Sequence, residues 1–204
     1  MNTLKQKALA IAFVLGAGLS PLANAAPITY NGTGGAVPSS GTSGLFSSSI
    51  VVAETGFIND VSLTLNGFSH SWIGDLYATL VFNDGSNPAT SVVVFGTLGA
   101  LGSSIDAGGN YTFSDGGASF PGAVNPISSG IYAPLGSFSV FDGLSAAGTW
   151  TLNLNDQYNG DSGNLDSWAL NISADEMSVP EPGTLALLGL GIAGLGAARR
   201  RQKA

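Results

Sequence analysis

A stretch in the second half of the chain is rich in side-chain oxygens. Residues 156–166 read Asp-Gln-Tyr-Asn-Gly-Asp-Ser-Gly-Asn-Leu-Asp. Ca²⁺ takes about six to eight such oxygens, but the spacing is not that of an EF-hand, which needs flanking helices and a Glu at the last position. The stretch predicts either a calcium-binding loop or a solvated turn in which Asp and Asn side chains bond to nearby backbone groups.

The sequence offers little for nucleophilic catalysis. Such hydrolysis needs a serine, a base and an orienting acid, whereas the chain has a single histidine, His70, and no Gly-x-Ser-x-Gly motif. We therefore expect a packed or hydrogen-bonded His70 and a protein that is not an enzyme. A glycoside hydrolase stays open as a lower alternative, because two of the many carboxylates could pair across a groove without a sequence signature.

Residues 1–25 have the three parts of a secretory signal peptide. Lys5 and Lys7 precede an apolar run at 8–19, and Pro21 leads into Ala23-Asn24-Ala25. A basic start, an apolar centre and small residues around the cleavage point are the signature of export. We expect cleavage after Ala25 and transfer of the chain across the inner membrane.

The C-terminal tail combines three features in order. Val179, Pro180, Glu181 and Pro182 begin the motif at 179–184; an apolar segment follows at 185–198, and Arg199, Arg200 and Arg201 begin the basic end at 199–204. A helix over the apolar segment would be about 21 Å long, short against a hydrocarbon core of about 30 Å, with the arginines on the cytoplasmic side.

This tail resembles the PEP-CTERM sorting signal, in which an exosortase, a membrane protease, recognises the Pro-Glu-Pro motif and removes the tail. The resemblance implies transient insertion of the helix into the inner membrane, processing by an exosortase, and delivery to the cell surface or the extracellular space. An ordinary C-terminal transmembrane anchor is the alternative.

The charges divide sharply along the chain. All 6 basic residues lie in the two end segments, and of the 13 acidic residues only Glu181 lies outside 26–178. Nucleic-acid binding is excluded, because it needs Lys and Arg to displace counterions from phosphates. The chain has no cysteine and must fold without disulfides.

The region between the end segments has an all-β pattern. Apolar and polar residues alternate along 61–66 and 167–173, as in strands with one buried face. Further strands are expected at 50–52, 76–82, 91–95, 110–113, 137–141 and 149–154, and turns at 83–85, 108–110 and 159–161. About eight short antiparallel strands predict a β-sandwich of jelly-roll form.

The boundaries follow from this pattern. The sandwich is expected over 49–174, after a Gly/Ser-rich lead-in at 26–48 that could also lay down a first strand, and a linker and the sorting signal occupy 175–204.

Two motifs in this region resemble the proprotein-convertase P domain, also called Homo B. They are His70-Ser-Trp-Ile-Gly-Asp-Leu76, and Gly148-Thr-Trp-Thr-Leu-Asn-Leu-Asn-Asp156 followed by residues 160–170. The family is a jelly-roll sandwich found beside subtilisin-like proteases and in other secreted bacterial proteins. The resemblance implies a non-catalytic domain, since serine endopeptidase activity belongs to a catalytic domain for which this sequence has no room. Some P domains bind calcium, which makes Asp75, Asp156 and Asp161 the first ligands to expect.

We therefore expect an exported, exosortase-sorted module of the cell surface or of an exopolysaccharide or biofilm matrix. Trp72, in a loop between two strands, is a candidate contact for a saccharide. The alternative is an accessory P domain that associates with a separately encoded, secreted subtilisin-like protease.

Overall fold

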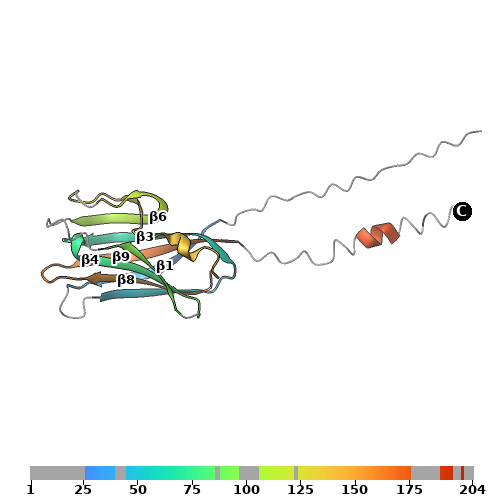
Figure 1. The fold of residues 1–204 in the computed structure, drawn as a ribbon, viewed down its shortest axis with the longest axis horizontal. Helices are drawn as coiled ribbons and strands as arrows, with labels where there is room; N and C mark the ends of the chain where they lie inside the picture. Colours follow the sequence, from blue (N-terminus) through green and yellow to red (C-terminus); the bar gives the residue numbers. More distant parts are fainter. Residues whose placement is uncertain are drawn as a thin grey trace, which may run out of the picture.

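The computed structural model describes residues 26–39, 45–85, 88–96, 106–121, 124–175, 189–194 and 199. Two stacked β-sheets make up a sandwich (Figure 1). One sheet has five strands in the order β1-β9-β3-β6-β7, and the other has four in the order β2-β8-β4-β5. The elements are β1 (Ile28–Val37), β2 (Leu45–Val52), β3 (Phe57–His70), η1 (Ile73–Asp75), β4 (Leu76–Asn83), β5 (Thr90–Phe95), β6 (Ala107–Ser119), β7 (Gly130–Ala133), η2 (Phe138–Phe141), β8 (Gly148–Asp156) and β9 (Gly163–Asp175), where η marks a 3-10 turn.

The strand order is that of a jelly roll. The first strand pairs with the last, β1 with β9, and the second with the one before the last, β2 with β8. In the first sheet, β3 lies between β9 and β6. In the second sheet, β4 lies between β8 and β5. This nested antiparallel pairing defines the jelly roll, with β7 added in parallel at the edge beside β6. The expected fold class is therefore confirmed.

Alternation of apolar and polar residues builds the core between the sheets. Every second residue of β4 and of β8 is buried, and the inner faces of both sheets contribute to one cluster of buried side chains. Large aromatic rings fill its centre: Phe82 stacks on Trp150 with ring centroids 4.3 Å apart. The Trp168 indole N–H is satisfied inside the core by donating to Ser48 Oγ at 3.0 Å.

The expected loose lead-in is instead part of the sandwich. Residues 28–37 form β1 and pair along β9, so the alternative of a first strand in this segment is the one that the structure shows. Its glycines serve close packing. A side-chain carbon at Gly32 would overlap the Trp168 indole, and one at Gly34 would overlap the Leu165 carbonyl oxygen.

Two further expectations about local structure were wrong. Residues 138–141 form η2 and not a strand, because the Asp115 carboxylate accepts hydrogen bonds from the backbone N–H groups of Phe138 (2.9 Å) and Ser139 (3.0 Å). Residues 108–110 do not turn but run inside β6, where Gly109 has a φ of 145°. The short strand β7 was not anticipated.

Most of the two end segments lies outside the described residues, including Ala23, Ala25, the motif at 179–182, Arg200 and Arg201. Within the expected tail helix, residues 189–194 are helical. Arg199, the first residue of the basic end, is also helical. Among the described residues, no helix has the length and apolar character needed to cross a membrane.

The packing of β1 on β9 generates a stability prediction. Gly34→Ala should destabilise the fold by about 1–3 kcal/mol, because the added methyl meets the rigid backbone of β9 and the strands must separate. The control is Gly116→Ala, where nothing lies within 4 Å of the added carbon, and we expect a change within about 0.5 kcal/mol. Urea denaturation measures both, and equal effects would contradict the role of Gly34.

Candidate metal centre

Three carboxylates converge where the chain passes between the sheets at one end of the sandwich. Asp75 closes η1, Asp156 ends β8, and Asp161 lies in the connection from β8 to β9. One carboxylate oxygen from each lies within 4.8 Å of the others. The structure thus brings together the three aspartates expected as ligands, although Asp75 is distant in the sequence from Asp156 and Asp161.

Backbone pairing fixes two of these residues relative to each other. Asp156 pairs with Leu76 across β8 and β4, directly after Asp75. The backbone N–H of Gln157 donates to the Asp75 carbonyl oxygen at 3.0 Å. The carboxylates of Asp75 and Asp156 are therefore held together by the sheet itself, so their proximity is a property of the fold.

The cluster is partly desolvated. Asp156 is only 2% exposed, and Asp75 and Asp161 are half-buried. Asp156 Oδ1 accepts the backbone N–H of Tyr158 at 3.0 Å, but its Oδ2 and the Oδ2 of Asp161 are buried without a hydrogen-bond partner among the described residues. Leaving such oxygens unpaired is costly.

Burial raises the pKa of the Asp75 carboxyl, and the nearby charges of Asp161 and Asp156 raise it further, whereas His70 lowers it. Each of these raising effects disfavours ionised Asp75. The site as built by the protein alone is therefore short of positive charge.

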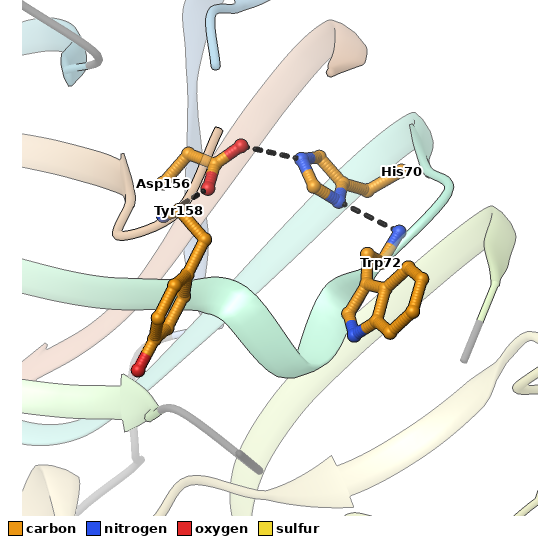
Figure 2. A network of polar contacts seen from close by, with 4 residues as sticks. All are labelled: His70, Trp72, Asp156 and Tyr158. Atoms are coloured by element: carbon orange, nitrogen blue, oxygen red, sulfur yellow. Dashed lines mark hydrogen bonds and ion pairs between the residues drawn. The ribbon is translucent and has the colours of Figure 1, made fainter. Parts of the chain in front are cut away.

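His70 is buried, and its ring lies beside Asp156, one member of this cluster (Figure 2). Its Nδ1 accepts the backbone N–H of Trp72 at 3.1 Å, and its Nε2 lies 3.4 Å from Asp156 Oδ2. The expectation of a packed histidine describes this environment, but its contact with Asp156 was not anticipated. The sequence carries no direct signal for it, because the two residues lie on strands of different sheets.

The donor set fits a hard cation. Carboxylate oxygens are the ligands of Ca²⁺, two of them are buried and unpartnered, and residues 26–178 contain no Lys or Arg that could balance them. Asp166, at the end of the oxygen-rich stretch, is exposed and accepts from Asn164 Nδ2 at 2.9 Å. Only part of that stretch therefore belongs to the cluster.

Two exposed aromatic rings lie next to this network. Trp72 is 38% exposed and Tyr158 is 58% exposed. The backbone amide of each bonds to the buried pair, Trp72 to His70 and Tyr158 to Asp156 (Figure 2). The polar network therefore holds both loops that carry these rings.

The raised pKa of Asp75 predicts a pH dependence in the presence of a chelator. A carboxyl with a folded-state pKa above the unfolded value of about 3.9 favours folding at low pH, and this contribution is lost as the pH rises through the folded pKa. Asp75→Asn should therefore be more stable, relative to the wild type, at pH 7 than at pH 4. Unfolding free energies from urea titrations in EDTA measure the difference, and a difference that is the same at both pH values would refute the prediction.

Comparison with known proteins identifies two segments of the chain. Residues 178–201 match the PEP-CTERM protein-sorting motif, and residues 125–172 match the proprotein convertase P-domain. No curated protein matches the sequence.

Two solved structures of Aeromonas sobria proteins are similar in part. One is the serine protease in complex with the chaperone, with 16% identity over 74% of this chain and 28% of that one and a TM-score of 0.39. The other is the serine protease, with 15% identity over 72% of this chain and 27% of that one and a TM-score of 0.37. The chain thus spans little more than a quarter of the length of these structures. The chain thus carries a C-terminal segment that matches the PEP-CTERM protein-sorting motif, and the second half of its β-sandwich contains a segment that matches the proprotein convertase P-domain.

Proposed function

We propose that this protein is an exported, exosortase-processed, non-catalytic module of the cell surface or extracellular matrix, and that its carboxylate cluster binds Ca²⁺. The observation that carries the cation site is the convergence of Asp75, Asp156 and Asp161 within 4.8 Å. Two of their buried oxygens have no partner among the described residues. Because residues 26–178 contain no Lys or Arg, a bound cation is the natural counter-charge.

A structural role for the cation follows from its position. Asp156 belongs to the four-stranded sheet, and Asp161 leads into β9 of the five-stranded sheet. A bound Ca²⁺ would hold both to η1 and close this end of the sandwich. Weak calcium sites of this kind fill in extracellular conditions, where calcium is at millimolar levels.

A non-catalytic role agrees with the P-domain match, since this domain is an accessory to the catalytic domain of proprotein convertases. Three acids that converge within 4.8 Å of one another form an arrangement that suits a shared cation.

A matrix polysaccharide is the partner that the exposed rings favour. Trp72 and Tyr158 project from loops anchored to the cluster, and aromatic rings with one exposed face stack on sugars without needing positive charge. The alternative partner is a separately encoded, secreted subtilisin-like protease, which the P-domain match favours.

The cation site is tested by thermal unfolding of the full-length protein in mild detergent with Ca²⁺ and with EDTA. Calcium at about a hundred times its dissociation constant should add about 2.7 kcal/mol, which raises the Tm by about 5–10 °C for a domain of this size. Asp156→Asn and Asp161→Asn should abolish the shift. Asp166→Asn, in the same stretch but outside the cluster, should keep it. A wild-type Tm that is the same in Ca²⁺ and in EDTA would refute the proposed cation site.

Sorting and matrix binding are tested together by fractionating cells that contain an exosortase. The wild type should be recovered outside the inner membrane, beginning at Ala26 and lacking the basic end by mass spectrometry. Replacement of Pro180, Glu181 and Pro182 by alanine should leave the tail uncut.

Trp72→Ala should be processed normally but wash out of the polysaccharide fraction. If Trp72→Ala stays in that fraction, or if the protein co-purifies with a subtilase alone, the matrix partner is wrong.

A further inference from the structure

The position of His70 raises the question of which metal the cluster would accept. Three carboxylates beside one imidazole could in principle make a mixed nitrogen and oxygen site, which is the chemistry that Zn²⁺ favours. Whether His70 can supply a ligand depends on which ring nitrogen carries a hydrogen.

A hydrogen bond from the Trp72 backbone indicates which ring nitrogen of His70 carries a hydrogen. Its N–H donates to His70 Nδ1 at 3.1 Å, and a ring nitrogen that accepts a hydrogen bond carries no hydrogen itself. The neutral imidazole therefore has its hydrogen on Nε2. An imidazole with a hydrogen on Nδ1 could not accept this bond from Trp72.

The Nε2 atom of His70 faces the buried carboxylate of Asp156. His70 Nε2 lies 3.4 Å from Asp156 Oδ2 (Figure 2), and both atoms are buried with no hydrogen-bond partner among the described residues. Asp156 Oδ1 is held from the other side by the Tyr158 backbone N–H at 3.0 Å. Asp156 Oδ2 thus lies against the His70 ring without a hydrogen bond between them, while Asp156 Oδ1 accepts the Tyr158 N–H.

We propose that His70 is a positioning residue of the carboxylate cluster. This inference rests on the cation site proposed above. With its hydrogen on Nε2, the ring orients Asp156 and offers no lone pair to a metal. The cluster is therefore an oxygen-only site that selects Ca²⁺ and gives Zn²⁺ no nitrogen ligand. Outer groups that orient a ligand in this way affect metal affinity about 10–100-fold.

The wild-type protein provides the first test, because its only histidine gives a single set of ring signals. Long-range ¹H–¹⁵N correlation spectra of the full-length, ¹⁵N-labelled protein in detergent should show neutral His70 with hydrogen on Nε2 in EDTA. The same tautomer should persist when Ca²⁺ or Zn²⁺ is added. A hydrogen on Nδ1, or a Zn²⁺-dependent shift of Nε2 typical of a ligand, would overturn the inference.

Two variants test the positioning role by calorimetric titration with CaCl₂. His70→Leu keeps an apolar side chain of moderate size but loses the donor, and should weaken Ca²⁺ binding about 10–100-fold. His70→Gln places an amide N–H near the position of Nε2, and should bind Ca²⁺ about as tightly as the wild type. Equal affinities for all three proteins would refute the role of His70. If His70→Leu fails to fold, the wild-type spectra and the glutamine variant still decide.

The outcomes separate the two proposals. A wild type that binds neither metal would overturn the cation site and this inference together. A wild type that binds Ca²⁺, but whose His70 ring also ligates Zn²⁺, would overturn only the inference.

Discussion

The main physical constraint on the end of the sandwich that carries the carboxylate cluster is buried negative charge, which no Lys or Arg of the domain balances. Asp156 is almost fully buried, its neighbours Asp75 and Asp161 are acidic, and residues 26–178 contain no Lys or Arg. Burying charges without partners is costly, and the cation proposed above would offset this cost.

The jelly-roll topology explains why the acids meet. β8 pairs with β4 in one sheet, which brings Asp156 beside Leu76. β9 pairs with β3 in the other sheet, which brings Gly163 beside His70. The connection from β8 to β9 crosses between the sheets and carries Asp161 with it. The cluster therefore sits at a crossing required by the strand order, where the two halves of the core meet.

Sequence reasoning predicted the fold class, because alternation marks half-buried strands, and it named the three aspartates that the structure brings together, because the family motifs include these acids. It misjudged β1, whose glycines resemble a flexible segment but are required where Gly34 faces the Leu165 backbone. It also placed a strand at Phe138, where the distant Asp115 carboxylate caps a 3-10 turn. The His70 tautomer depends on a backbone hydrogen bond, and composition and spacing carry no information about such geometry.

The pairing of β1 with β9 also sets a direction for the whole domain. Ile28 lies opposite Ile172, near the end of β9, whereas the carboxylate cluster adjoins the beginning of that strand at Gly163. Both ends of the sandwich's chain thus leave from the pole opposite the cluster, separated from it by the length of β9, about 40 Å at 3.3 Å per residue. A partner bound at the loops of Trp72 and Tyr158 would therefore lie at the far end of the sandwich from Asp175, where the sorting tail begins.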